Sequence, residues 1–278
     1  MSISIDTQYL ISNISLLPNI MFRNTQLKSK KDIQKLRDAN RLVAETFEML
    51  REYVQPGAKL SDLDRIAEEF IVKHGAKVLY KGYTGGSRNT PPFPGTICAS
   101  VNEEICHGLP NDRTLKEGDI IGVDIGVRLR GWCGDACVTY PVGQISEEAR
   151  RLLQVTEQAL YIGIKTAQPG AYLHDIGAAI QDFVEAQGMS VVREWGGHGI
   201  GRELHESPSV SHVRMPTRGP KLRPGMVFTI EPMINLGRPE WILLDDGWTV
   251  ITRDRSLSAQ FEHTIAITPK GPEILSKL

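Results

Sequence analysis

The sequence of 278 residues lacks the features that mark several classes of protein. It contains four cysteines and no Cys-x-x-Cys pair, which argues against a secreted disulfide scaffold and against a structural zinc site with tightly spaced ligands. The formal net charge is −1 and no basic block is present, so nothing favours nucleic acid or a membrane surface as a partner. No apolar run approaches the roughly 18 to 20 residues that span a membrane. We therefore expect a soluble, cytoplasmic protein with reduced thiols.

The first 27 residues also lack a recognisable folded element. Their first basic residue is Arg23, so the basic start of a secretory signal is missing. We predict a flexible extension over residues 1–27, with an organelle-targeting segment as the alternative. Residues 28–278 are predicted to form one domain, because a chain of this length buries roughly three quarters of the surface that its unfolded form exposes.

What the chain does contain is an internal repeat. Gln55-Pro56-Gly57-Ala58 recurs as Gln168-Pro169-Gly170-Ala171, and the apolar and acidic residues that follow recur in step. In each half, a Leu-x-x-Gly segment leads six residues later to an acid in an apolar, strand-like run, Asp124 in the first half and Glu231 in the second. Two copies that face each other, residues 28–145 and 146–278, would bring these acids to a shared seam.

Hydrophobic periodicity predicts helices followed by strands in each half. The helices of the first half run from Ser29 to Val54 and from Ser61 to His74, and both start at a Ser-x-x-Asp pattern that is typical of an N-cap. The other predicted elements are helices over 146–166 and 173–187 and strands over 96–101, 119–127, 136–142, 227–234, 249–251 and 263–268. This order favours an α+β fold in which helices cover one face of a mostly antiparallel sheet.

Four acids stand in contexts that a solvated surface position does not explain. Asp124 lies in Gly-Val-Asp-Ile-Gly, whose glycines let other groups approach the backbone closely. Asp135 follows eleven residues later, after a tight turn, so that a hairpin would present both carboxylates on adjacent strands. Glu231 and Glu262 lie inside apolar strand patterns of the second half. Because carboxylates are seldom buried unless they are paired or metal-bound, these acids indicate a metal site.

A histidine completes the set. His198 lies in Gly196-Gly197-His198-Gly199-Ile200-Gly201, which is too rich in glycine for a packed helix or strand, so we expect this histidine on an open loop. A phosphate-binding loop is the alternative, but no P-loop Lys-Ser/Thr follows. Two Asp, two Glu and one His suit two divalent ions, and a water held between such ions becomes a nucleophile near neutral pH. The pattern predicts metal-assisted hydrolysis.

Several motifs together resemble the methionine aminopeptidases of type 1, from about residue 28 to the C-terminus. They are Asn102-Glu103-Glu104-Ile105-Cys106-His107-Gly108-Leu109-Pro110, Gly-Val-Asp124-Ile-Gly, Gly-His198-Gly-Ile-Gly-Arg-Glu-Leu-His205-Glu, Thr-Ile-Glu231-Pro-Met and Ser-Leu-Ser-Ala-Gln-Phe-Glu262-His-Thr. The resemblance implies the pita-bread fold, a duplicated α+β architecture with pseudo-twofold symmetry, and a single catalytic domain over 28–278. The implied activity removes the N-terminal methionine from nascent proteins.

The resemblance also implies roles for individual residues. His107 and His205 would contact the substrate amide and the tetrahedral intermediate, a role that also fits the need of a developing oxyanion for hydrogen-bond donors. Glu231 would act as proton shuttle in addition to binding metal. The two divalent ions, whose identity the sequence leaves open among Mn, Fe, Co and Zn, would be held by Asp124, Asp135, His198, Glu231 and Glu262.

Specificity for methionine requires a snug apolar pocket. The resemblance nominates as its walls Phe93, Cys98, His107, Leu204 and Trp248. Ordinary core packing is the alternative, above all for Phe93 and Leu204. Two departures from the family pattern leave the accepted second residue of the substrate open. The segment 83–92 is longer than the usual loop, and Leu204 stands where an aromatic residue is common.

The remaining histidines are expected to have no part in catalysis. We predict that His74, His174 and His212 lie on the surface, and that His263 points to the opposite face of its strand from Glu262 and is structural.

Two other functions stay open. An X-Pro aminopeptidase or prolidase would share the fold, but these enzymes usually carry an additional N-terminal domain. A non-catalytic binding module would have lost metal ligands. We expect a monomer that acts on nascent peptides beginning with methionine and a small second residue, with docking on the ribosome left open.

Overall fold

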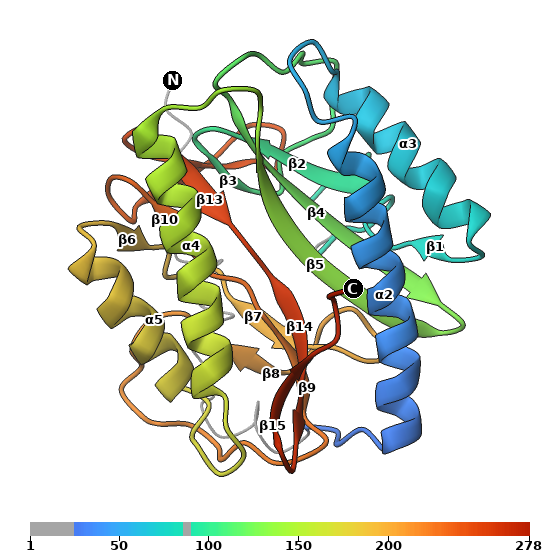
Figure 1. Ribbon diagram of the computed structural model, residues 1–278, viewed down its shortest axis with the longest axis vertical. Coiled ribbons are helices and arrows are strands. Elements are labelled where there is room, and N and C mark those ends of the chain that lie inside the picture. The colour runs from blue at the N-terminus through green and yellow to red at the C-terminus, as the bar shows by residue number, and fades with distance from the viewer. Residues whose placement is uncertain (1–24, 86–89) are drawn as a thin grey trace.

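The computed structural model describes residues 25–85 and 90–278, and Figure 1 shows the arrangement of their helices and strands. The helices are α2 (Lys30–Arg51), α3 (Leu60–Lys73), α4 (Glu147–Thr166) and α5 (Asp175–Ala186). The strands of the first half are β1 (Lys77–Val78), β2 (Ile97–Val101), β3 (Glu104–Cys106), β4 (Ile120–Leu129) and β5 (Trp132–Pro141). Those of the second half are β6 (Ser190–Val191), β7 (Gly197–Gly199), β8 (Glu206–Val210), β9 (Val227–Ile230), β10 (Met233–Asn235), β11 (Trp241–Leu243), β12 (Val250–Thr252), β13 (Ser258–Gln260), β14 (His263–Thr268) and β15 (Gly271–Ile274).

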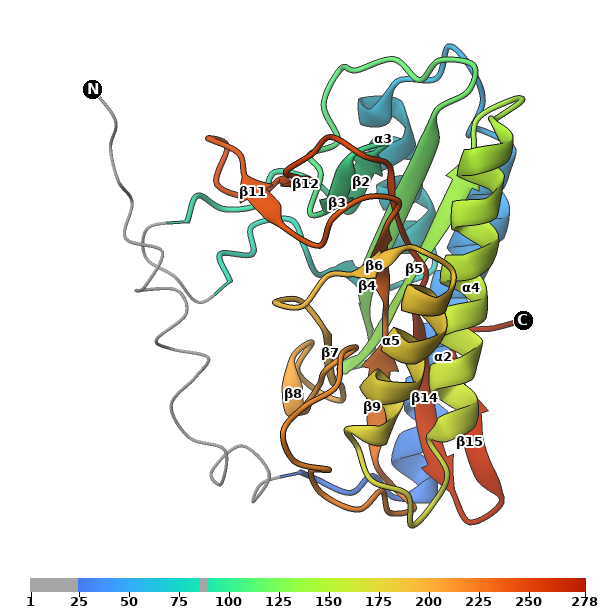
Figure 2. The same ribbon diagram turned by 90° about the vertical axis from the view of Figure 1, so that its left-hand side faces the viewer.

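The strands pair in antiparallel fashion within four small sheets. Their orders are β1-β4-β2 with β5 also on β4, β15-β14-β9-β7-β8, β13-β10-β6 and β11-β12-β3. Helix α2 packs on β4 and β5, and α4 packs on β9, β10 and β13. The view in Figure 2 shows α2 and α4 along one side of the strands, with the β11–β12 hairpin projecting from the other side. The predicted α+β architecture is confirmed.

The internal repeat is a repeat of structure. The N–H of Gly57 donates to the carbonyl of Leu115, and the N–H of Gly170 donates to the carbonyl of Leu222, both at 2.8 Å. These two glycines have φ of +93° and +88°, a left-handed conformation that favours glycine. Strands β4 and β5 pair in the first half as β9 and β14 pair in the second. In each half, the loop between the two helices is therefore hydrogen-bonded to the loop that precedes the strand leading to Asp124 or Glu231.

The N-cap prediction holds at one of the two serines. Ser29 and Asp32 form a capping box at the start of α2, because each side chain accepts the backbone N–H of the other, an arrangement that stabilises a helix by about 1 kcal/mol. The second predicted cap is wrong. Helix α3 begins at Leu60, Ser61 donates its hydroxyl to Asp112, and the carboxylate of Asp64 accepts the N–H groups of 96 and 97. Distant groups have therefore taken both side chains: the Asp112 carboxylate binds the Ser61 hydroxyl, and Asp64 binds two backbone N–H groups that would otherwise be buried and unpaired.

The predicted strand over 227–234 is interrupted at a position that matters for function. Strand β9 ends at Ile230 and β10 begins at Met233. Pro232 lies in the break, and proline has no N–H to donate to a strand ladder. Glu231 thus lies between two strands rather than inside one.

The beginning of the described chain is tied to the rest of the fold. The N–H of Lys28 donates to the carbonyl of Gly225 at 2.7 Å, and its buried ammonium lies 2.5 Å from the carboxylate of Glu206. Most of the predicted flexible extension lies outside the described residues, and the single domain over 28–278 stays a prediction. Within 25–85 and 90–278, none of the helices has both the length and the apolar character needed to cross a bilayer.

Candidate metal centre

The first half supplies two carboxylates from one hairpin, as predicted. Strands β4 and β5 pair over their full length, with Asp124 opposite Cys137 and Gly126 opposite Asp135. Residues directly opposite each other in a ladder share a face, so this register places both aspartates diagonally on the same face. The register of this hairpin sets the spacing of the two carboxylates.

The second half supplies its candidate ligands from separate segments. The open loop predicted for His198 is wrong, because His198 lies in the short strand β7, which pairs with β8 and β9. Glu231 follows β9, and Glu262, predicted inside a strand, lies between β13 and β14. The glycines on either side of His198 are required, because a Cβ at Gly197 or Gly199 would lie 2.2 Å from a backbone oxygen of a neighbouring segment. The close approach that they permit lets the N–H of His198 donate to the Thr229 hydroxyl at 2.9 Å.

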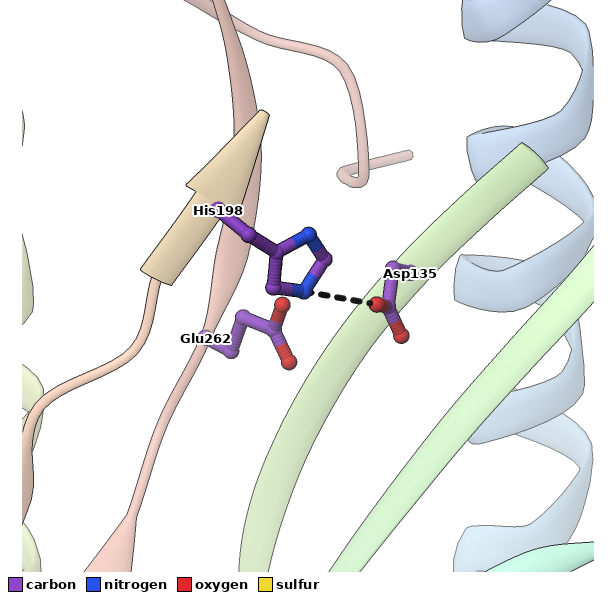
Figure 3. A group of neighbouring side chains, drawn as sticks. All are labelled: Asp135, His198 and Glu262. Carbon is purple, nitrogen blue, oxygen red and sulfur yellow. Dashed lines mark ion pairs between the residues drawn. The ribbon is translucent and has the colours of Figure 1, made fainter. Parts of the chain in front are cut away.

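These segments converge on the hairpin. The Nε2 atom of His198 lies 3.5 Å from Oδ2 of Asp135 and 3.7 Å from Oε1 of Glu231. Asp135, His198 and Glu262 each offer a ligand atom within 4.8 Å of the others, and Figure 3 shows the three side chains pointing toward one another. Ligand atoms about 2.0 to 2.2 Å from one ion must lie this close together. These three residues therefore form a group that suits a divalent cation.

The charges in this group call for a cation. Burial raises the pKa of Asp124 and of Glu262 well above the usual range, and the neighbouring charge of Asp135 raises both further. Burial also raises the pKa of Glu231 to about 7. Although burial alone would lower the pKa of His198, its hydrogen bond to Asp135 and the nearby carboxylates raise it to about 9. Buried carboxylates this close together are costly to ionise unless positive charge compensates them.

One buried oxygen makes the same point. Oε1 of Glu262 is buried and has no hydrogen-bond partner among the residues that the structure describes. A buried carboxylate oxygen without a partner costs free energy, and a bound ion would remove that cost. The donor set thus fits the predicted metal.

A tyrosine that the sequence reasoning missed reaches into this site. The hydroxyl of Tyr80 lies 2.5 Å from Oδ1 of Asp124 and 2.6 Å from Oδ1 of Asp135. Its ring packs over Gly126, where a Cβ would lie 2.6 Å from Cε1 of the ring. The glycine after Asp124 signalled a close approach of some group to the strand, but the sequence does not say which group approaches.

The two candidate catalytic histidines lie beside aromatic residues. His205 is 4.3 Å from His198 between ring centroids, and its Nδ1 lies 2.9 Å from the Tyr83 hydroxyl. His107 packs edge-on against Trp195 and Trp248, at 5.4 and 6.2 Å between ring centroids. Burial lowers the pKa of both His107 and His205 to about 4, so both imidazoles are neutral at pH 7.

The other predicted pocket walls fall in one buried hydrophobic cluster. Phe93, Cys98, Leu204 and Trp248 share this cluster with Tyr80. Phe93 meets Trp248 edge-on at 5.3 Å between centroids, and the indole N–H of Trp248 donates to the carbonyl of Pro91 at 2.7 Å. Pro91 is thereby fastened to the cluster.

Two histidines are not where the sequence placed them. His174 and His212, predicted on the surface, are buried. His174 lies just before α5 and shares a hydrogen bond of 2.7 Å with the carbonyl of Thr217, while Nε2 of His212 accepts the N–H of Glu231 at 3.1 Å. Their burial follows from these tertiary partners. His74 is exposed as predicted, and His263 shares a hydrogen bond with Ser276, whereas Glu262 beside it joins the ligand group.

Comparison with known proteins decides the family. Residues 34–269 match the family model described as metallopeptidase family M24. The chain belongs to this family. As an M24 metallopeptidase it uses divalent metal, and the group of Asp135, His198 and Glu262 is the part of the structure that fits this use.

The relatives of this M24 peptidase bear out the resemblance to methionine aminopeptidases. Methionine aminopeptidase 1 of Bacillus subtilis is 49% identical over 251 residues, covering 90% of this chain and 98% of that protein. Methionine aminopeptidase of Escherichia coli K12 is 47% identical over 253 residues, covering 90% and 93%. The crystal structure of methionine aminopeptidase from Rickettsia prowazekii has a TM-score of 0.87 at 44% identity, covering 91% of this chain and all of that one.

A prolidase shares the fold at a greater distance. The prolidase of Pyrococcus horikoshii has a TM-score of 0.72 at 22% identity, and the match covers 91% of this chain but 64% of the prolidase. At this identity the likeness concerns the fold alone. The predicted pita-bread fold, common to both groups, is confirmed.

Proposed function

We propose that this M24 peptidase is a methionine aminopeptidase that removes the N-terminal methionine from nascent proteins with a small second residue. The observation that carries the proposal is the meeting of Asp135, His198 and Glu262 at the seam of the two halves, in a chain nearly half identical to methionine aminopeptidases. The peptidase would act as a monomer in the cytoplasm, where its four free thiols stay reduced.

Two divalent ions would be held by five residues. Asp135, His198 and Glu262 form the group described above. Glu231 lies next to His198 of this group, and Asp124 contacts the same Tyr80 hydroxyl as Asp135 does. When bound, the ions would supply an activated water and polarise the scissile carbonyl. Mn, Fe, Co and Zn all suit these oxygen and imidazole donors.

Glu231 would carry the proton of the reaction. The Thr229 hydroxyl donates to its Oε1 at 2.7 Å and the amide of Gln260 donates to its Oε2 at 3.4 Å, so the carboxylate is held in one orientation. Burial raises the pKa of Glu231 to about 7. A group that is half-protonated near neutral pH can take a proton from water and return it to the leaving amine.

His107 and His205 would hold the substrate amide. Both are neutral at pH 7, so each has one N–H to donate to an oxygen on which negative charge develops. A hydrogen bond donated by the Tyr83 hydroxyl to Nδ1 of His205 would leave the proton on Nε2. The methionine side chain would lie against His107 and the cluster of Phe93, Cys98, Leu204 and Trp248.

Peptide hydrolysis with defined metals tests the proposal. The metal-free full chain is supplied with Mn²⁺, Fe²⁺, Co²⁺ or Zn²⁺ and incubated with Met-Ala-Ser, Leu-Ala-Ser or Ala-Pro-Ser. We expect release of methionine from the first peptide with at least one metal, and little hydrolysis of the other two. Preferred hydrolysis of Ala-Pro-Ser would favour an X-Pro aminopeptidase, and no hydrolysis with any metal would favour a binding module.

A further inference from the structure

Tyr80 joins the two carboxylates of the first half through one hydroxyl. This hydroxyl stands at hydrogen-bond distance from Oδ1 of Asp124 and from Oδ1 of Asp135, at 2.5 and 2.6 Å. It is the one hydrogen-bond partner of the Asp124 carboxylate within the described residues. On Asp135 it occupies Oδ1, while Oδ2 faces His198. Because the Tyr80 hydroxyl binds Oδ1, Oδ2 is the Asp135 oxygen that faces the other predicted metal ligands.

The position of Tyr80 is itself well determined. The N–H of Leu79 donates to the carbonyl of Gly126 at 3.1 Å, which aligns this segment with β4, the strand of Asp124. The ring fills the space above Gly126 and meets Phe93 edge-on at 6.4 Å between centroids. The side chain is buried, so the hydroxyl has little freedom to turn toward water. A rigid donor of this kind can hold a ligand carboxylate in one orientation.

Asp135 is held from two further directions. Its N–H donates to Oδ1 of Asn40 in α2 at 3.1 Å, and its carbonyl accepts the hydroxyl of Thr264 in β14 at 2.8 Å. Backbone contacts of this kind fix where the residue lies but leave its carboxylate free to rotate. The Tyr80 hydroxyl supplies the missing restraint on that rotation.

We propose that Tyr80 is a positioning residue of the metal centre, whose hydroxyl keeps the Asp124 and Asp135 carboxylates turned for metal binding and so sets the affinity for divalent ions. Hydrogen-bond partners of metal ligands typically change metal affinity by about 10 to 100-fold when they are removed. The inference rests on the metal centre of the proposed function, and it assigns a role to a side chain outside the predicted ligands.

Metal titration of matched variants tests this role. The full chain, stripped of metal, is titrated with Mn²⁺ by calorimetry as wild type, Tyr80→Phe and Tyr140→Phe. Tyr140 is the control because it is also buried and its hydroxyl donates to the carbonyl of Phe47 at 3.0 Å, away from the acids. We expect Tyr80→Phe to weaken at least one Mn²⁺ binding step by about 10 to 100-fold and Tyr140→Phe to bind Mn²⁺ as the wild type does. The visible spectrum of bound Co²⁺, which reports ligand geometry, should change in Tyr80→Phe alone.

A second variant tests the role while keeping the hydroxyl. Gly126→Ala would place a methyl 2.6 Å from the Tyr80 ring and displace it, so Mn²⁺ binding should weaken here as well.

Unchanged Mn²⁺ affinity and Co²⁺ spectrum in Tyr80→Phe would overturn the inference. Tighter Mn²⁺ binding in that variant would also overturn it, because the phenol would then compete with the ion. A phenolate-to-Fe³⁺ absorption band in the wild type would make Tyr80 a ligand instead. Failure of the wild type to bind any divalent ion would count against the proposed function itself.

Discussion

The two halves of the molecule build their shares of the candidate metal centre in different ways. The first half places Asp124 and Asp135 on one hairpin, where the pairing of β4 with β5 sets their spacing. The second half gathers His198, Glu231 and Glu262 from three segments that belong to no common hairpin. The two halves therefore share a pair of acids on or beside paired strands, Asp124 and Asp135 on β4 and β5 and Glu231 and Glu262 beside β9 and β14, and only the second half adds a histidine, His198 from β7.

In each half, a hydroxyl group lies at hydrogen-bond distance from the carboxylate, of Asp124 in the first half and of Glu231 in the second. Tyr80 contacts Asp124 from 44 residues away in sequence, whereas Thr229 donates to Glu231 from two residues away. Tertiary packing therefore positions the Tyr80 hydroxyl in the first half, whereas the local backbone positions the Thr229 hydroxyl in the second half. A carboxylate with a defined hydrogen-bond partner is already oriented when metal arrives, and the two halves reach this condition by different routes.

The largest expected effect compares one acid from each half. Asp124→Asn and Glu262→Gln keep the shape of the side chain and remove its charge, so each should lower turnover by at least about 100-fold while the fold is retained. Turnover, bound metal per chain and circular dichroism are measured together. Retention of more than about a tenth of wild-type turnover, with two ions still bound, would contradict the dinuclear centre. Unequal loss in the two variants would show which half contributes more to it.

The next effect concerns the two histidines, His107 from the first half and His205 from the second. Replacement of either by Ala should lower kcat by roughly 100-fold, because each would lose a donor to the developing oxyanion. Metal content should stay unchanged. Loss of an ion in one variant would mean that the histidine of that half is a ligand.

Glu231 should change the pH dependence of the free energy of unfolding, whereas an exposed acid should not. Burial raises the pKa of Glu231 to about 7 from an ordinary 4.5, so the folded metal-free protein binds more protons than the unfolded chain between these values. The contribution of Glu231 to the free energy of unfolding is therefore greatest below pH 4.5. It declines as pH rises through 7, by up to about 3 kcal/mol.

Chemical unfolding in chelator at pH 5 and pH 8 measures this decline. Glu231→Gln should reduce the decline, while Glu157→Gln, at an exposed position of α4, should leave it as in the wild type. Added Mn²⁺ should restore stability at pH 8 in the wild type. An equal decline in Glu231→Gln and the wild type would show that the burial of Glu231 does not govern this dependence.

The smallest expected effect concerns the pocket. The sequence resemblance predicts that Leu204 replaces an aromatic residue, so Leu204→Phe should narrow the range of accepted second residues without changing metal content. One methylene of pocket fit is worth about 1 to 3 kcal/mol, which limits the change in kcat/KM for any one peptide to roughly 10 to 200-fold. A series of Met-X peptides gives the ranking. The same ranking in wild type and variant would mean that Leu204 is only part of the core cluster.

Much of the fold could be predicted because its signals are local. The repeated Gln-Pro-Gly-Ala segment marks the loop after the first helix of each half, and its glycines do have positive φ. The capping box at Ser29 needs only residues 29 and 32, which lie within one turn. The cap at Ser61 failed because Asp112 and buried N–H groups at 96 and 97 compete for the same side chains. Competition of that kind cannot be read from a window of a dozen residues.

For the candidate site, the sequence by itself determined which acids and which histidine are set apart, because carboxylates inside apolar runs and a histidine among glycines are unusual wherever the chain folds. Only the tertiary structure decided that Tyr80 would reach Asp124 and Asp135, and that His212 would be buried behind Glu231. The physical reason is the same in both cases. A hydrogen bond across the fold depends on which segments pack side by side, and neither tyrosine nor histidine carries a sequence pattern that names its distant partner.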